Sequence, residues 1–404
     1  MSMLIDLDMP KQNYSILIVG ILCHPSHIVR FIRNLKFVNP SARISLLTNR
    51  EPGVYPKEVH ECLDEFLKWR ISDRLSWFPF VNQQINRFSF SLQIRKLVKT
   101  RRYDIVDIHY PQPFLSSLMR QLRKMSTSIA ITPWGSDVLR LEGKRNRKQL
   151  AKVFQKADYI TVAAQGDIGD RLINEMKVDK HKLYPLVWGS ETIDYINEHI
   201  QKVSTEDAKK RLGLENRYVI TCGYNAFEEQ RHEIMISAIR EIKSQLHPNL
   251  VLLFPVTYGY SYGTRKKEYV ERLKGICRES GLDAVFYEDY LSVADLFYLR
   301  QGTDMFIHIQ TTDGGNSSLQ EYVLCGKKVV HGAWIHYDYL EKYKPLFYFP
   351  VDDLNHLGDI VLNAYCSAPI KTPEEVISFI RNRGWKAKMA LWDAFFSTIC
   401  QPTC

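Results

Sequence analysis

Residues 305–330 read MFIHIQTTDGGNSSLQEYVLCGKKVV, and this stretch contains the pattern of a strand, a loop, a helix and a second strand. The apolar run 305–309 predicts a buried strand, 316–325 a helix, and the closing Val-Val pair the next strand. The loop carries two glycines, and Asp313 and Glu321 bracket the helix start. Glycine lets the backbone approach a ligand, and first-turn helix amides suit a pyrophosphate. The alternative is an ordinary strand-to-helix turn.

The same alternation of short apolar runs and amphipathic stretches covers the whole chain of 404 residues. It predicts parallel sheets with helices on both faces, and so an α/β protein with two doubly wound lobes. The polar segment 200–215 separates the two series and is the predicted linker. We predict a first lobe over 1–195, a second over 210–375, and a final helix within 380–404 that packs on the first lobe. The predicted strands are 16–20, 43–48, 105–108, 128–132 and 159–162, then 218–222, 251–255, 284–286, 305–309, 328–330 and 347–349.

Positive charge is concentrated in the first half of the chain. Residues 1–190 hold 30 Lys and Arg against 17 Asp and Glu, whereas the whole chain holds 54 against 45. Such clusters suit nucleic acid, an anionic membrane surface or a phosphorylated substrate, and a solvated helical face is the alternative. The clustered cations are Arg87, Arg95, Lys96, Lys99, Arg101, Arg102, Arg120, Arg123, Lys124, Lys144, Arg145, Arg147 and Lys148.

Composition also indicates the compartment. No apolar run approaches the length of about 18 residues that a membrane-spanning helix needs, and acids stand near the amino terminus where a signal peptide carries bases. The eight cysteines form no CxxC pair, so neither a zinc cage nor a disulfide framework is predicted. We expect a cytoplasmic protein without a metal site.

The segment from Asp313 to Glu321 resembles the E-x7-E signature of the large retaining family of GT-B glycosyltransferases, with Asp313 in the place of the first glutamate. The following Leu324-Cys-Gly-Lys-Lys-Val-Val330 is similar to the family's A-x-G-x-P-V-V ending. The resemblance implies that Asp313 holds sugar hydroxyls and that Glu321 binds the ribose of a nucleotide.

Further matches to this family occur in the same order along the chain. Together they imply the GT-B fold, in which two Rossmann-like lobes face a central cleft. The matching segments are Tyr103-Asp-Ile-Val-Asp-Ile-His-Tyr-Pro111, Ile131-Thr-Pro-Trp-Gly-Ser-Asp137, Ala157-Asp-Tyr-Ile-Thr-Val162, Val187-Trp-Gly-Ser-Glu-Thr-Ile193 and Cys222-Gly-Tyr-Asn-Ala226 through Arg231.

The resemblance also implies roles for single residues. Arg231 stands where the family has its phosphate-binding lysine, and a fixed cation there stabilises the charge that develops on the leaving diphosphate. Trp134 replaces a histidine that touches the donor sugar in many relatives, and His109 is a candidate for acceptor contact. We predict Asp313, Glu321, Arg231 and His109 as the catalytic set. The predicted donor-binding residues are Gly20, Trp134, Asp137, Gly223, Tyr224, Asn225, Tyr258, Gly259, Gly315, Asn316, Ser317 and Ser318.

The donor's base is left open between uridine, deoxythymidine and guanosine diphosphates. The stretch Pro255-Val-Thr-Tyr-Gly259 is faintly similar to a P-x-T-Y-G segment of transferases that use a deoxythymidine-diphosphate sugar, and a tyrosine-rich turn over the core is the alternative. The tyrosines there suit stacking on a base.

These observations predict a retaining transferase that moves a hexose or deoxyamino-hexose from a nucleotide diphosphate to a glycan acceptor, with no required metal or cofactor. The basic first lobe is predicted to present a lipid diphosphate-linked acceptor at the inner membrane face. A catalytically idle sugar-nucleotide-binding partner subunit and a nucleotide-sugar 2-epimerase on the same fold stay open as alternatives. We do not expect nucleic-acid binding, because no recognition motif is present.

Overall fold

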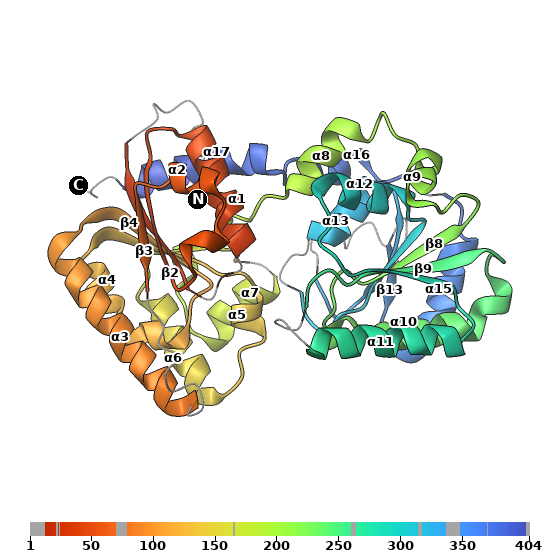
Figure 1. The fold of residues 1–404 in the computed structure, drawn as a ribbon, viewed down its shortest axis with the longest axis horizontal. Helices are drawn as coiled ribbons and strands as arrows, with labels where there is room; N and C mark the ends of the chain where they lie inside the picture. The colour runs from red at the N-terminus through yellow and green to blue at the C-terminus, as the bar shows by residue number, and fades with distance from the viewer. Residues whose placement is uncertain are drawn as a thin grey trace. The chain divides into compact units, whose positions relative to one another are not determined.

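The protein is described here from a computed structural model that covers residues 13–21, 23, 25–69, 79–164, 166–259, 264–313, 317–336, 348–369 and 371–400. The chain divides into two compact units: unit 1 comprises Met1–Trp188 and Trp385–Cys404, and unit 2 comprises Gly189–Gly384. Each unit contains one parallel sheet with helices on both faces (Figure 1). The predicted doubly wound architecture is therefore confirmed in both.

Unit 1 is built on a seven-stranded sheet in the order β3-β2-β1-β4-β5-β6-β7. Its strands are β1 (Ser15–Gly20), β2 (Arg43–Thr48), β3 (Glu65–Lys68), β4 (Tyr103–His109), β5 (Ser126–Thr132), β6 (Tyr159–Thr161) and β7 (Leu183–Tyr184). Its helices are α1 (Pro25–Val38), α2 (Lys57–Glu61), α3 (Pro79–Thr100), α4 (Met119–Arg123), α5 (Ser136–Leu139), α6 (Lys144–Gln155), α7 (Asp167–Asp170) and α17 (Trp385–Ile399).

Alternate residues of the unit 1 strands supply two separate cores. Leu17 and Val19 of β1 pack with α3, α4 and α6, whereas Ile16 and Ile18 pack with α1, α2 and α17. Successive side chains of a strand point to opposite faces, so a continuous apolar run such as β1 becomes buried on both sides. Figure 1 shows the same two helical layers on either side of the sheet.

Unit 2 repeats the plan with six strands in the order β10-β9-β8-β11-β12-β13. Its strands are β8 (Tyr218–Cys222), β9 (Leu250–Pro255), β10 (Ala284–Tyr287), β11 (Met305–His308), β12 (Lys328–Gly332) and β13 (Tyr348–Val351). Its helices are α8 (Glu191–His199), α9 (Thr205–Leu212), α10 (His232–Ile242), α11 (Thr264–Glu279), α12 (Val293–Gly302), α13 (Ser317–Leu324), α15 (Leu357–Cys366) and α16 (Glu374–Arg381).

The boundary between the units differs from the segment that the sequence suggested. Residues 200–215 contain helix α9, which begins at a capping box formed by Ser204 and Asp207 and ends at the left-handed Gly213. Lys209 of α9 also pairs with Asp304 at 2.7 Å, inside unit 2. The polar surface of α9 resembled a linker because only one side chain of this short helix is buried.

The final helix packs on unit 1. The Asp393 carboxylate of α17 accepts hydrogen bonds from the Tyr14 hydroxyl and from Asn39, both at 2.8 Å. Trp392 is fully buried beside Phe31 of α1, with ring centroids 5.0 Å apart. A helix at the end of the chain therefore completes a core whose strands come from its beginning.

Candidate functional site

The strand order places a ligand-binding position at the carboxyl ends of β8 and β11. The chain leaves β8 toward β9 on one side and returns to β11 on the other, so the loops after these two strands diverge. Open α/β sheets bind ligands at such a switch point. In unit 2 the loop after β8 leads to Arg231, and the loop after β11 leads to Asp313.

A hydrogen-bond network around Gln310 fixes these two loops to each other. The Gln310 side-chain oxygen accepts hydrogen bonds from the Tyr224 hydroxyl at 3.0 Å and from the Gln230 amide at 2.7 Å. The Gln230 oxygen in turn accepts from the Tyr224 backbone N–H at 3.2 Å. Gly223 has φ +63°, and a Cβ there would lie 2.6 Å from the Gln230 oxygen, so only glycine fits.

The loop after β9 contacts the loop after β8. The Ala226 N–H donates to the Tyr258 carbonyl at 2.6 Å, and Gly259 has φ +143° with its Cα facing the Ala226 backbone. Tyr258 keeps 50% of its surface exposed, while burial of its hydroxyl, which is hydrogen-bonded to Asn225, raises the pKa to about 12. The predicted donor-binding residues Gly223, Tyr224, Asn225, Tyr258 and Gly259 are thus brought together.

Arg231 lies between these loops in a costly backbone conformation. It has φ 62° and ψ 39°, the left-handed region, and it is the residue that caps the start of α10. Such strain in a non-glycine residue persists only where the surroundings fix it, and it is concentrated at functional sites. The guanidinium stands 4.9 Å from the Trp334 ring centroid and is 3.4 Å from the Ile309 carbonyl. Partial burial lowers its pKa, which still leaves it positively charged.

Asp313 is held by a histidine of the preceding strand. The Asp313 side chain is 5% exposed, and one of its oxygens lies 2.9 Å from Nε2 of His308, whose side chain is fully buried. His308 is the last residue of β11, so the rigid sheet fixes the orientation of the acid. The histidine was visible in the sequence as a polar residue within an apolar strand.

Glu321 is buried in an ion pair with Arg300. Its Oε2 lies 3.1 Å from Nε of Arg300, its Oε1 accepts from the Ser190 hydroxyl at 3.0 Å, and both charged side chains are at most 4% exposed. Arg300 also donates to the Tyr322 hydroxyl at 2.9 Å and to the Ser318 hydroxyl at 3.4 Å. Sequence reasoning missed Arg300 and Ser190, because an arginine near a helix end and a serine in a loop carry no local signal.

The other predicted donor-binding residues between Asp313 and Glu321 are Gly315, Asn316, Ser317 and Ser318. Ser317 and Ser318 are the first residues of α13, and Ser317 is exposed. Gly315 and Asn316 lie outside the described residues.

In unit 1 the predicted residues lie within or beside an aromatic cluster. The Trp134 ring is 5.2 Å from that of Trp188 and 5.7 Å from that of Tyr110. His109 is buried in this cluster, with Nε2 2.9 Å from the fully buried Asp107 carboxylate. A contact of His109 with an acceptor therefore needs the indole rings to move, and it stays a prediction.

Two further unit 1 residues have structural explanations. Gly20 ends β1 beside Ile28 of α1, whose side chain would lie 3.4 Å from an added Cβ, so the glycine stands where helix and strand pack closely. Asp137 is 4% exposed, accepts from the Trp134 N–H at 3.0 Å, and has its pKa raised by burial to about 7.

The raised pKa of Asp137 predicts a pH-dependent stability. A carboxyl whose pKa is higher in the folded protein than in the unfolded chain destabilises the fold progressively as pH rises from about 4 to about 7. We expect this group to lower the free energy of unfolding by roughly 2 kcal/mol between about pH 5 and pH 8. Urea unfolding of wild type and Asp137→Asn at both pH values measures the difference. The exposed Asp170→Asn is the control, and an equal pH dependence in Asp137→Asn and wild type would contradict the expectation.

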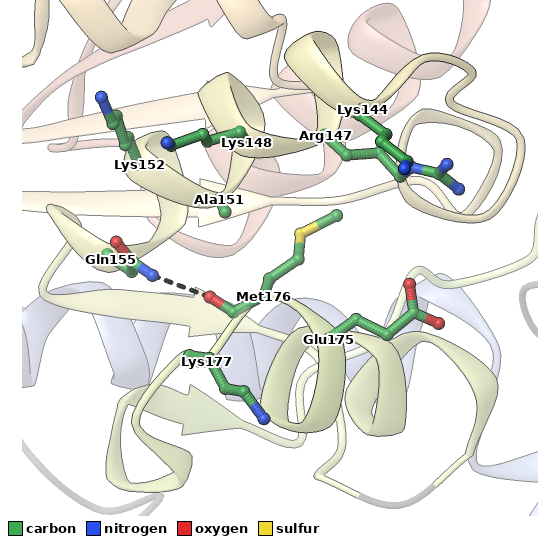
Figure 2. Close-up of a pocket in the computed structure, with 9 residues that line it drawn as sticks. All are labelled: Lys144, Arg147, Lys148, Ala151, Lys152, Gln155, Glu175, Met176 and Lys177. Atoms are coloured by element: carbon green, nitrogen blue, oxygen red, sulfur yellow. Dashed lines mark hydrogen bonds between the residues drawn. The ribbon is translucent and has the colours of Figure 1, made fainter.

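The basic clusters of the sequence gather on two surface pockets of unit 1. One, with a volume of about 420 Å³, has among its lining residues Lys144, Arg147, Lys148 and Lys152 of α6 together with Lys177 and a single acid, Glu175. Figure 2 shows Lys144 and Arg147 reaching to one side of this pocket and Lys148 and Lys152 to the other. Because the cations do not converge on one point, the pocket is suited to a spread of negative charge.

Within the described ranges, no cluster of three His, Cys, Asp or Glu side chains is arranged to hold a metal ion. None of the helices described is long and apolar enough to cross a membrane.

Comparison with known proteins finds a family match for part of the chain and a fold for nearly all of it. Residues 44–164 match the Glycosyl transferase 4-like family. No curated protein sequence matches the chain.

Solved structures are similar over almost the full length. A glycosyltransferase from Rickettsia africae ESF-5 has a TM-score of 0.70 at 14% identity, over 97% of this chain and 100% of its own. Sucrose-phosphate synthase from Thermosynechococcus elongatus gives 0.65 at 13%, over 95% and 98%. Anabaena HepE, solved in complex with UDP and glucose, gives 0.62 at 13%, over 96% and 97%. The chain thus has the GT-B fold of glycosyltransferases, and its residues 44–164 are similar to the glycosyl transferase 4-like family.

Proposed function

We propose that this protein is a retaining glycosyltransferase that takes its sugar from a nucleotide diphosphate bound at the switch point of unit 2. The observation that carries the proposal is the pair of buried acids, Asp313 and Glu321, each held by a basic side chain at the carboxyl edge of the sheet. Burying two carboxylates costs free energy unless they are paired. Anabaena HepE, which shares the fold, is a protein solved with UDP and glucose.

Each residue has a proposed part in binding or chemistry. The ribose diol donates hydrogen bonds to Glu321, whose oxygens have lone pairs that Ser190 and Arg300 do not use. Tyr258 stacks on the base. Asp313 accepts hydrogen bonds from the sugar hydroxyls. Arg231 stabilises the negative charge of the departing diphosphate, which is greatest in the transition state.

Retention then needs no side-chain base. The bond between the anomeric carbon and the diphosphate oxygen breaks, and the acceptor oxygen bonds to that carbon on the same face. The acceptor proton passes to the departing phosphate oxygen. We propose a lipid diphosphate-linked glycan as the acceptor, presented by unit 1 at the inner face of a membrane, in surface polysaccharide or glycolipid assembly.

Ligand-induced stabilisation tests the donor part of this proposal. A nucleotide that binds only the folded state stabilises it by about 2.7 kcal/mol at a hundred times its dissociation constant. We expect one of uridine, deoxythymidine or guanosine diphosphate to raise the melting temperature of the wild type. Glu321→Gln is expected to lose that shift, measured against the melting temperature of the variant itself.

The choice of glutamine follows from the ion pair. Alanine at position 321 would leave Arg300 buried without a partner and so confuse unfolding with lost binding, whereas glutamine keeps an oxygen for Ser190 or Arg300. The exposed Glu279→Gln is the matched control. No shift with any of the three nucleotides contradicts the proposal. Binding without turnover would indicate an idle partner subunit, and conversion of the donor without an acceptor would indicate a 2-epimerase.

A further inference from the structure

Helix α3 of unit 1 carries apolar side chains on its solvent face. Val81, Ile85, Phe88 and Leu92 are 45%, 41%, 64% and 48% exposed, and they are spaced by four, three and four residues. Residues at these intervals lie above one another along one side of a helix. The four side chains therefore form a single exposed stripe, which we call the α3 stripe.

The opposite side of α3 makes the ordinary contact with the core. Phe90 and Ile94 are fully buried in the core on this face of the sheet, and the Phe90 ring lies 4.6 Å from that of Trp69. Packing on the sheet therefore accounts for the inner face of α3 and leaves the stripe unexplained. Contiguous exposed apolar surface of this kind marks an interaction site.

The stripe continues into a groove of positive charge. Arg95, Lys96 and Lys99 follow it on the same side of α3, and with Arg120 and Lys124 they line a groove of about 850 Å³ between α3 and α4. Residues 79–103 contain no Asp or Glu. In the described part of the chain, none of these five cations is paired with a carboxylate.

We propose that the α3 stripe and the adjoining basic groove dock unit 1 on an anionic lipid surface. An interfacial helix buries its apolar side chains at the boundary between headgroups and acyl chains, while flanking Lys and Arg meet lipid phosphates. A second basic pocket lies on α6, which covers the same face of the sheet as α3 and α4 (Figure 1).

The charge and the apolar side chains of the α3 stripe and groove favour a membrane over other partners. A symmetric dimer formed through this face would place the same unpaired cations of two copies near each other, which costs free energy. Nucleic acid would satisfy the cations, but it offers no apolar partner for Val81, Ile85 and Leu92. An anionic bilayer supplies both an apolar layer and phosphates.

This inference deepens the proposed function, since it names the surface by which unit 1 would reach a lipid-linked acceptor. Its test needs no turnover. The full chain is sedimented with phosphatidylcholine vesicles, with and without phosphatidylglycerol, at low and high salt. We expect binding only to the anionic vesicles, weakened by salt because salt screens the charges.

Two variants separate the apolar and the charged contributions. Phe88→Ser with Leu92→Ser is expected to weaken binding on the order of tenfold or more. Arg95→Gln, Lys96→Gln and Lys99→Gln together are expected to weaken it on the order of a hundredfold, at about fivefold for each cation.

Each variant has a matched control in the chain. Phe37→Ser removes an aromatic ring that is 83% exposed on α1, on the other face of the sheet. Lys202→Gln, Lys210→Gln and Arg278→Gln make the same change of net charge on exposed positions of unit 2. Both controls are expected to bind vesicles like the wild type.

Unchanged vesicle binding in both α3 variants overturns the proposal. A dimer that forms without lipid and is lost in the Phe88→Ser, Leu92→Ser variant overturns it too, and assigns the face to a second copy. The nucleotide-induced rise in melting temperature is measured on the same α3 variants. Its retention shows that the donor site is intact, so failure of the docking proposal is distinguishable from failure of the proposed function.

Discussion

Replacing Arg300 by methionine is expected to lower the free energy of unfolding by roughly 3 to 5 kcal/mol, because it leaves the Glu321 carboxylate buried without its cation. Glu321 is 3% exposed, so solvent compensates for little of the lost interaction, and the Ser190 hydroxyl supplies a single hydrogen bond. Methionine keeps most of the volume of the arginine side chain, so the loss of stability comes from the missing charge and not from a cavity. Urea unfolding of wild type and variant measures it.

An exposed ion pair of the same unit is the control. Arg381 and Glu374 lie 3.3 Å apart with side chains 42% and 76% exposed, and Arg381→Met is expected to cost at most about 1 kcal/mol. Adding Glu321→Leu to Arg300→Met is expected to recover part of the loss, because no buried charge then remains. If Arg300→Met lowers the free energy of unfolding no more than Arg381→Met does, then Glu321 does not depend on Arg300 for its stability in the folded protein, and the prediction is wrong.

Replacing Arg231 by alanine is expected to reduce kcat about tenfold to a hundredfold. The physical reason is the loss of a charge-assisted hydrogen bond, worth roughly 1.5 to 3 kcal/mol, to the departing diphosphate. Steady-state transfer with saturating donor measures the change. A rise in KM with unchanged kcat would contradict the role, because it would mean that Arg231 binds donor and transition state equally.

The backbone at Arg231 offers a second variant that separates chemistry from folding. Glycine adopts the left-handed conformation without the cost that other residues incur, so Arg231→Gly is expected to fold at least as stably as Arg231→Ala. Both variants lose the guanidinium and are expected to lose the same amount of kcat. Arg272→Ala is the control, since that exposed arginine pairs with Glu233 on the surface. Equal turnover in Arg272→Ala and wild type would show that removing an arginine elsewhere is harmless.

Much of the fold was predictable from local sequence patterns. The central strands β1, β8 and β11 are buried on both faces and therefore appear as short, mostly apolar runs, and β4 keeps the apolar residues Ile105, Val106 and Ile108 between its polar ones. The sequence gives no comparable signal for β3 and β7, because edge strands are short and only half buried. Residues 200–215 have the composition of a linker for the same reason, since a surface helix with one buried side chain is as polar as a linker.

Local patterns along the chain are enough to predict the two doubly wound sheets and the loops that follow their strands, including the segment from Asp313 to Glu321. Apolar periodicity and glycine spacing are local properties, so they can be read along the chain. The side chains that hold the acids come from distant parts of the chain and meet only in the folded protein. Ser190 is 131 residues from Glu321, and Arg300 is 21 residues from it on a different helix. Contacts of this kind depend on how helices pack over the sheet, and no spacing along the chain encodes them.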